Sequence, residues 1–121
     1  FLDFHGEATA EKAGMGHFLD GRVSCVVGTH THIPTADTRI QPNGTAFQSD
    51  AGMCGVYQSS LGMDFNAVVK RFELGGKFHM QPAGGEATLC GVLVEIDETT
   101  GLAAKVEPFR YSGCLSQTEQ A

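Results

Sequence analysis

The first third of the chain alternates between short apolar runs and one stretch with helical spacing. Phe1–His5 predicts a short buried strand, and Val23–Val27 is a continuous apolar run typical of a strand buried on both faces of a parallel sheet. Between them, Thr9 fits the N-cap of a helix that ends near Leu19. Strand, helix and strand in this order predict a right-handed βαβ unit. The helix face expected to pack on the sheet has helical spacing and consists of Ala10, Ala13, Gly14, His17 and Phe18.

Two further pairs of apolar segments have the pattern of β-hairpins. Arg39-Ile40 and Ala46-Phe47 flank Pro42-Asn43-Gly44, which predicts a tight turn between two short strands. Near the carboxyl end, Leu89–Ile96 and Leu102–Phe109 predict two longer strands that are joined by a polar segment. The chain therefore combines a βαβ unit with hairpins and belongs to the α/β class.

A second helix is predicted in the loop-rich middle of the chain. Asp64 fits its N-cap, and Gly75-Gly76 ends it after about Leu74. Its apolar residues are spaced as on one helix face and are expected to be buried against a sheet: Phe65, Val68, Val69 and Phe72.

The composition changes this picture little, but it limits the domain count and the partners. A chain of 121 residues with 41% hydrophobic residues is long enough for one packed domain, which we assign to residues 1–111, with a polar tail at 112–121. The net charge is −6 and no basic cluster is present, which argues against a stable nucleic-acid complex. No apolar run approaches the roughly 18–20 residues that span a bilayer, so we expect no membrane partner. Because the chain opens with an apolar run at Phe1, we expect it to be a piece of a longer protein.

The cysteines favour a reducing compartment. They are scattered, form no C-x-x-C pair and fit no zinc spacing, and two of them lie inside apolar runs. We therefore predict reduced core thiols in a cytoplasmic protein, at Cys25, Cys54, Cys90 and Cys114.

Three histidines follow the predicted parallel strands and are the strongest candidates for chemistry. His5 ends the first strand, and His30 and His32 come just after the second, so all three are expected at the same edge of the sheet. His30 and His32 are two positions apart, which directs their side chains to the same side in extended backbone. Imidazoles that converge in this way favour a metal site. Carboxylates near them in the sequence are Asp3, Glu7, Asp37 and Asp50.

Other interpretations apply to single residues of this region. One histidine at a strand end is usually structural, and we assign structural roles to His17 and His79. The start of the helix near Thr9 could hold an anion, but Glu7 and Glu11 could equally serve that helix end.

The motifs around the histidines resemble the bacterial YmdB-like metallophosphoesterases. His30 and His32 lie 25 and 27 residues after His5, and the resemblance extends in order through most of the chain. The segments that carry it are Asp3-Phe4-His5-Gly6-Glu7-Ala8-Thr9, Asp20-Gly21-Arg22-Val23-Ser24, Val27-Gly28-Thr29-His30-Thr31-His32, Thr35-Ala36-Asp37, Asp50-Ala51-Gly52-Met53, Leu61-Gly62-Met63-Asp64 and Leu93-Val94-Glu95-Ile96-Asp97.

The resemblance implies a metal-dependent phosphoesterase with a dinuclear metal centre. Its expected substrates are phosphodiesters such as 2′,3′-cyclic nucleotides, and its expected cofactors are two divalent or mixed-valence ions, iron or manganese, with zinc as an alternative. By the same resemblance, His5 and His30 bind the second metal ion and His32 binds the first. The fold implied is the four-layer β-sandwich of this superfamily, with flanking helices.

The chain matches only the carboxyl-terminal half of the family pattern. The family's early Asp, bridging Glu and Gly-Asn-His segment have no counterpart here, so we identify no catalytic residue in this chain. The expected partners are the amino-terminal half of the same protein and further copies in a homo-oligomer. One alternative is a non-catalytic fragment or interaction module that retains the fold only. Another is a structural zinc domain, which would unfold on chelation.

Overall fold

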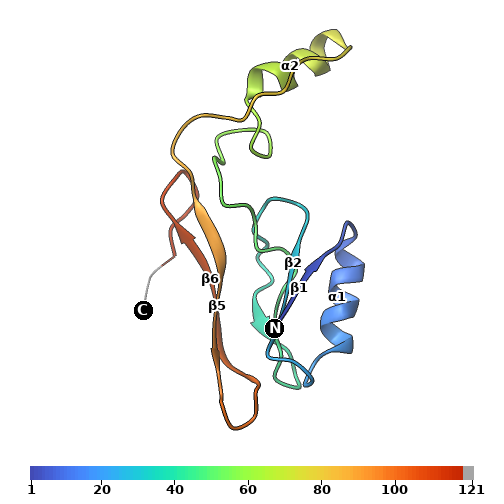
Figure 1. Ribbon diagram of the computed structural model, residues 1–121, viewed down its shortest axis with the longest axis vertical. Helices are drawn as coiled ribbons and strands as arrows, with labels where there is room; N and C mark the ends of the chain where they lie inside the picture. Colours follow the sequence, from blue (N-terminus) through green and yellow to red (C-terminus); the bar gives the residue numbers. More distant parts are fainter. Residues whose placement is uncertain (119–121) are drawn as a thin grey trace. The chain divides into compact units, whose positions relative to one another are not determined.

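The computed structural model describes residues 1–118, in which two helices and six strands form (Figure 1). The described residues divide into two compact units. The first contains Phe1–Met53 and Cys90–Phe109, and the second contains Cys54–Leu89 and the segment that starts at Arg110. Neither helix of the described residues has the length and apolar character needed to cross a membrane.

The first unit is organised by a βαβ unit with parallel strands, as predicted. Strands β1 (Leu2–His5) and β2 (Cys25–Thr29) pair in parallel and flank helix α1 (Thr9–Phe18) in the sequence. The hairpin of β3 (Arg39–Ile40) and β4 (Ala46–Gln48) is also confirmed. β4 additionally pairs in parallel with β2, so the sheet order is β1-β2-β4-β3.

Burial in two of these elements differs from the prediction. β1 was expected to be buried, but Asp3 and His5 are exposed and Leu2 and Phe4 are only partly covered, because β1 is the edge strand of the sheet. β2 is buried over most of its length, yet it begins at Cys25 rather than at Val23.

Helix α1 begins and packs differently from the expectation. Its N-cap is Ala8 rather than Thr9, and no side chain caps it. The predicted packing face of Ala10, Ala13, Gly14, His17 and Phe18 is exposed, whereas Lys12 and Gly16 are the buried residues. Gly16 lies so close to the Phe47 ring that a Cβ on it would come within 2.5 Å of a ring carbon. The close approach of the helix to β4 therefore selects a face that the apolar spacing does not indicate.

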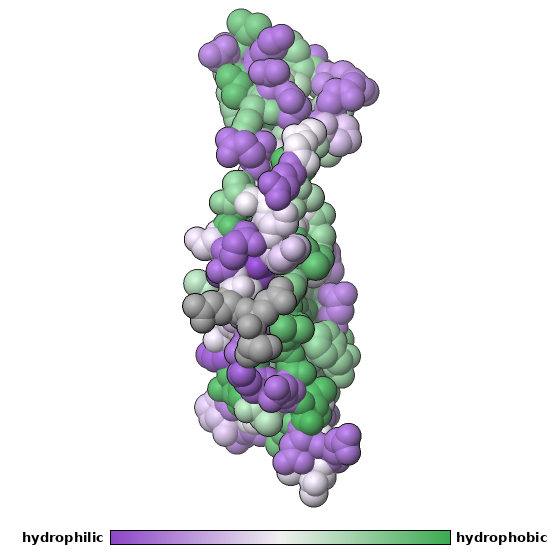
Figure 2. Space-filling view, turned by 90° about the vertical axis from the view of Figure 1, so that its left-hand side faces the viewer, coloured by the Kyte–Doolittle hydropathy of each residue, from purple (hydrophilic) through white to green (hydrophobic). Residues whose placement is uncertain are grey.

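Strands β5 (Leu89–Ile96) and β6 (Ala103–Tyr111) form the second predicted hairpin, joined through Asp97–Gly101. Its inner side chains cover the parallel sheet and complete the core of the first unit. This core consists of Cys25, Val27 and Ala46, against which Ala51, Val92, Val94, Ala103 and Val106 pack. On the side where β5 and β6 lie in Figure 1, hydrophobic residues also reach the surface (Figure 2), and Leu93 and Ile96 are exposed.

In the second unit, helix α2 (Phe65–Leu74) has the predicted bounds. Asp64 caps it by accepting a hydrogen bond from the Asn66 amide, and the helix ends at Gly75, whose φ is 70°. The predicted burial of its apolar face is wrong, because no residue of α2 is buried. Helical periodicity thus identified the helix correctly, but it did not reveal that this face is uncovered.

These observations confirm a mixed α/β fold, and the four-layer sandwich remains a prediction. The boundary between a domain at 1–111 and a polar tail at 112–121 also stays a prediction, and residues 119–121 lie outside the described residues. Within the described residues, none of the four cysteines forms a disulfide. Core positions are confirmed for Cys25 and Cys90, but Cys54 and Cys114 are exposed, so their assignment to the core is wrong.

Candidate functional site

The carboxyl ends of β1 and β2 bring two of the predicted histidines into contact. The register places His5 opposite Thr29, so His30 follows directly on the neighbouring strand. The His5 Nε2 and His30 Nδ1 atoms are 3.3 Å apart, and the two rings meet edge to face with centroids 5.2 Å apart. The predicted approach of these histidines is confirmed.

Thr29 orients the His5 ring from its other side. The His5 Nδ1 atom lies 3.0 Å from the Thr29 hydroxyl oxygen, within hydrogen-bond distance. A partner on one ring nitrogen fixes the rotation of the imidazole and directs the other nitrogen. Here it directs the Nε2 atom of His5 toward His30.

The backbone carrying His30 and His32 is in an unusual conformation. Their φ angles are 149° and 70°, a region that residues with a side chain rarely adopt. Such a conformation costs on the order of 1–3 kcal/mol and persists only where neighbouring contacts hold it. Strained backbone of this kind clusters at functional sites, which supports the assignment of a function to this loop.

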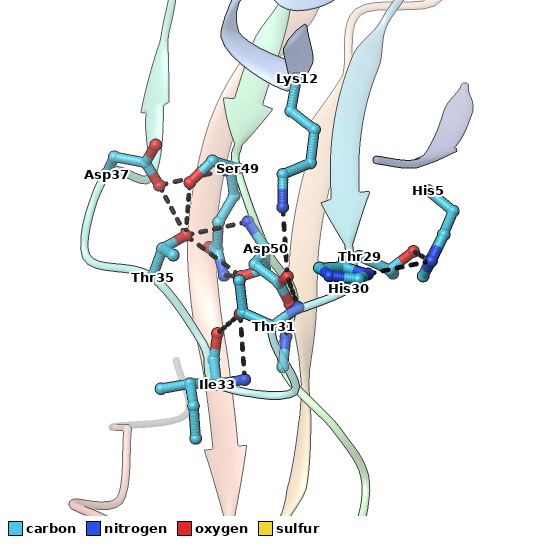
Figure 3. A network of polar contacts seen from close by, with 12 residues as sticks. His5, Lys12, Thr29, His30, Thr31, Ile33, Thr35, Asp37, Ser49 and Asp50 are labelled. Atoms are coloured by element: carbon cyan, nitrogen blue, oxygen red, sulfur yellow. Dashed lines mark hydrogen bonds and ion pairs between the residues drawn. The ribbon is translucent and has the colours of Figure 1, made fainter. Parts of the chain in front are cut away.

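Asp50 supplies the contacts that hold the histidine loop (Figure 3). Its Oδ2 atom accepts a hydrogen bond of 2.7 Å from the Thr31 amide, which lies between the two strained histidines. Its Oδ1 atom accepts one of 2.9 Å from the Gly52 amide. One buried carboxylate therefore fixes the loop after β2 and the loop after β4 together.

The charge of Asp50 is balanced by a lysine from helix α1. The Lys12 Nζ atom lies 3.4 Å from the Asp50 Oδ2 atom, and both side chains are 1% exposed. Burial by itself would raise the pKa of the Asp50 carboxyl. The hydrogen bonds from the Thr31 and Gly52 amides and the nearby ammonium outweigh burial and hold this pKa below its ordinary value.

A second network braces the loop that connects β2 and β3. The Thr35 hydroxyl donates to Asp37 Oδ1 at 2.7 Å and accepts from the Asp50 amide at 2.9 Å. The Ser49 amide donates to the same Asp37 oxygen at 3.1 Å. Burial opposes ionisation of Asp37, but these hydrogen bonds outweigh it and lower the pKa of its carboxyl. Asp37 therefore stabilises the backbone of this loop through its hydrogen bonds.

A cavity of about 230 Å³ lies at this edge of the sheet. All three predicted histidines line it, and of the nearby carboxylates only Asp50 does so. The lining residues are His5, Thr29, His30, His32, Asp50, Gly52 and Met53. Asp3, Glu7 and Asp37, which were considered as neighbours of a metal, are absent from the lining, as are His17 and His79.

Two residues of this arrangement were missed in the sequence. Lys12 follows Glu11 on a helix, and nothing in its spacing indicates burial beside a carboxylate. Thr29 is adjacent to His30, but its role depends on the pairing of β1 with β2. No signal in the sequence indicates either role. The structure shows that Gly28 leaves room for Lys12, because a Cβ there would lie 2.6 Å from Lys12 Cδ and 1.9 Å from the Ser49 carbonyl oxygen.

The donor set fits part of a metal site. Two nitrogens that bind one ion at about 2.0–2.2 Å lie roughly 2.8–3.6 Å apart for angles between octahedral and tetrahedral values. The separation of 3.3 Å between the His5 and His30 nitrogens falls in this range. Within residues 1–118, however, no group of three or more His, Cys, Asp or Glu side chains is arranged to hold a metal ion.

The buried cysteine of β2 is not a candidate nucleophile. Burial raises the pKa of the Cys25 thiol to about 11, and the charge of the amino terminus opposes this only weakly. A thiol with this pKa is protonated at neutral pH and therefore unreactive.

Comparisons with known proteins agree on one family. The family model described as "YmdB-like protein" matches residues 1–109. A 2′,3′-cyclic-nucleotide 2′-phosphodiesterase of Bacillus subtilis (strain 168) is 50% identical over 107 residues, which cover 88% of this chain and 40% of that protein. A putative phosphatase/phosphodiesterase of Mycoplasma pneumoniae is 39% identical over 110 residues, which cover 90% of this chain and 39% of that protein. This chain thus spans about 40% of the length of these curated relatives.

Two solved structures share the fold over 93% of this chain. One is the crystal structure of a novel phosphatase from Mycoplasma pneumoniae, with a TM-score of 0.86, 38% identity and 40% of that chain covered. The other is a hypothetical protein from Thermus thermophilus, with a TM-score of 0.84, 36% identity and 44% of that chain covered.

Proposed function

The chain belongs to the YmdB-like protein family, and we propose that it forms part of a metal-dependent phosphoesterase. The proposed reaction is hydrolysis of phosphodiesters such as 2′,3′-cyclic nucleotides. The names of the relatives from Bacillus subtilis and Mycoplasma pneumoniae support this reaction class. Because this chain spans about 40% of their length, the proposed activity belongs to the whole protein.

The observation that carries the proposal is the histidine pair at the strand ends. His5 and His30 present nitrogens 3.3 Å apart, and both residues line the cavity that His32 also lines. We assign His5 and His30 to one ion and His32 to a second ion. When bound, two divalent cations supply Lewis-acid activation of water and neutralise the charge of the phosphoryl oxygens. Iron or manganese is the proposed metal, with zinc as the alternative.

The residues of this chain prepare the site rather than complete it. Thr29 sets the rotation of the His5 ring, and Asp50 holds the Thr31 amide so that His30 and His32 keep their strained backbone. The Lys12 ammonium balances the charge of the buried Asp50 carboxylate. The remaining ligands, the bridging carboxylate and the general acid are proposed to come from the amino-terminal half of the protein.

Activity of the chain with and without that half tests the proposal. The metal-reconstituted chain alone should hydrolyse a 2′,3′-cyclic nucleotide hardly at all, and addition of the amino-terminal half should restore turnover. His5→Ala, His30→Ala and His32→Ala should each reduce the restored rate on the order of 10²–10³-fold. His79→Ala is the matched control and should leave the rate unchanged, because this exposed histidine does not line the cavity.

Two results would contradict this proposal in different ways. Turnover by the chain alone at the level of the intact protein, abolished by His32→Ala, would show that the chain builds a complete site. Absence of turnover by the intact protein with every divalent metal would reject the phosphoesterase function itself.

A non-catalytic module that retains the fold is the second candidate function. It is favoured by the lack of any three-ligand group within residues 1–118. Calorimetric titration of the intact protein with Mn²⁺ separates the two candidates, because a phosphoesterase should bind metal through His5, His30 and His32 and the module should not. If chelation unfolds the chain, a structural zinc domain would replace both candidates.

A further inference from the structure

The cavity that the three histidines line has one long apolar side chain among its described lining residues, that of Met53. This side chain is partly buried. The other lining residues carry an imidazole, a hydroxyl, a carboxylate or no side chain at all. Met53 therefore differs in its chemistry from every residue that the proposed function uses in this cavity.

A turn at Gly52 directs Met53 to the cavity. Ala51 packs against the core of the first unit, and in extended backbone the residue two positions later would point to the same side. Gly52 has a φ of 82°, a left-handed conformation that breaks this alternation. The Met53 amide then donates a hydrogen bond of 2.9 Å to the carbonyl oxygen of His32. Met53 is thus held beside the histidine loop and lines the cavity, whereas Ala51 belongs to the core.

The thioether of Met53 is unsuited to the ionic part of the proposed reaction. It has no charge and no hydrogen-bond donor, so it cannot neutralise phosphoryl oxygens. Its sulfur is a soft ligand, which suits ions such as Cu(I) rather than Mn²⁺. A methionine side chain is suited instead to an uncharged carbon group, and above all to an aromatic ring, because its polarisable sulfur makes favourable contacts with such rings.

We propose that Met53 contacts the organic part of the substrate next to the phosphoryl group and gives the site a preference for phosphodiesters that carry an aromatic ring there. In a 2′,3′-cyclic nucleotide this ring is the base. The inference rests on the proposed function, because a phosphoryl group that reaches ions on the three histidines must enter the cavity that they line. In a cavity of about 230 Å³, a group attached to the phosphorus cannot be far from any lining side chain, and Met53 is one of these.

Binding of two phosphonates to the intact, Mn²⁺-loaded protein tests the proposal. Phenylphosphonate and methylphosphonate carry the same charged head group and are not hydrolysed, so they differ in the organic group that Met53 would contact. Isothermal titration calorimetry should show that the unmodified protein binds phenylphosphonate about tenfold more tightly, which is the size of effect that a small apolar contact produces in a binding pocket.

Variants of Met53 separate this contact from the rest of the site. Met53→Ala should weaken phenylphosphonate binding about tenfold and leave methylphosphonate binding within about twofold. Met53→Gln keeps the length of the side chain and should have the same effect, so it replaces Met53→Ala if the shorter side chain impairs folding. Met53→Leu keeps an apolar side chain of similar volume and should retain most of the preference. Met63→Ala is the matched control, because Met63 is 39% exposed and does not line the cavity.

Three results would overturn the proposal and leave the proposed function intact. The first is equal binding of both phosphonates by the unmodified protein, and the second is an unchanged preference in Met53→Ala and Met53→Gln. The third is equal weakening of both phosphonates, which would show that Met53 supports the histidine loop rather than contacting the organic group. If the unmodified, Mn²⁺-loaded protein binds neither phosphonate, the proposed function itself is rejected, and this inference with it.

Discussion

Replacement of Lys12 by Met should destabilise the first unit, although methionine is apolar and has a similar length. The Lys12 ammonium lies 3.4 Å from Asp50 Oδ2, and both side chains are 1% exposed. Lys12→Met removes the only cation that the structure places against this carboxylate within the described residues, and it leaves the negative charge buried. The desolvated charge, rather than a lost contact, is the source of the expected loss.

The magnitude follows from the remaining contacts of the carboxylate. Loss of one partner from a buried ion pair costs about 3–5 kcal/mol. Asp50 keeps its hydrogen bonds from the Thr31 and Gly52 amides, and the 3.4 Å separation is longer than a charge-assisted hydrogen bond. Both facts favour the lower end of the range. We expect the free energy of unfolding to fall by about 3 kcal/mol at neutral pH.

Urea unfolding followed by circular dichroism measures this loss, and amide hydrogen exchange in β2 assigns it to the first unit. Lys105→Met is the matched control, because it removes a lysine whose ion pair with Glu107 is exposed to solvent, and it should cost far less. The deficit of Lys12→Met should also shrink as the pH is lowered, because protonation of Asp50 removes the buried charge. A loss no larger than that of Lys105→Met, or a deficit independent of pH, would refute the assignment of the buried charge.

Three further predictions concern the same framework and helix α2. Hydrogen bonds lower the folded-state pKa values of the Asp37 and Asp50 carboxyls. The contribution of these two carboxylates to the free energy of unfolding should therefore be complete above the unfolded-state carboxyl pKa and should be lost as the pH falls through the folded-state values. Urea unfolding at stepwise lower pH measures the direction of this change. Gly28→Ala should destabilise the fold by about 1–3 kcal/mol or more, since its Cβ would lie 1.9 Å from a carbonyl oxygen, whereas Gly14→Ala, with no atom within 4 Å, should be neutral or stabilising in thermal unfolding. Asp64→Ala should cost about 1 kcal/mol of helix stability, measured as amide exchange in α2, by removing the N-cap hydrogen bond.

The elements of the fold were largely predictable, because each has a strong local signal. The β-hairpin from Leu89 to Tyr111 and helix α2 follow from apolar periodicity, turn residues and the Asp64 cap. Burial was less predictable, since it depends on what lies opposite each face. The apolar face of α2 has the pattern of a buried helix, and the pattern is the same whether a sheet, another segment or a second copy covers it.

The site was predictable as far as it depends on strand topology. His5 and His30 meet because parallel strands end at the same edge of the sheet, and this follows from the order of the elements. The positive φ angles of His30 and His32 were not predictable, because they result from tertiary contacts rather than from local preference. Asp50 was noted in the sequence as a nearby carboxylate and as part of a segment that resembles the family, but its hydrogen bond to the Thr31 amide is evident only in the structure.

The wrong choice of face for α1 and the unpredicted role of Lys12 have the same physical cause. Apolar spacing assigns a helix face by hydrophobicity, and on α1 it selects small residues that remain exposed. The buried face instead carries Lys12, whose ammonium pairs with the buried Asp50 carboxylate that holds the histidine loop. Gly28 leaves the space through which the Lys12 side chain passes, and Gly16 lets the helix approach Phe47. Helix α1 therefore contacts the same carboxylate that holds the histidine loop, which links the packing of this helix to the site.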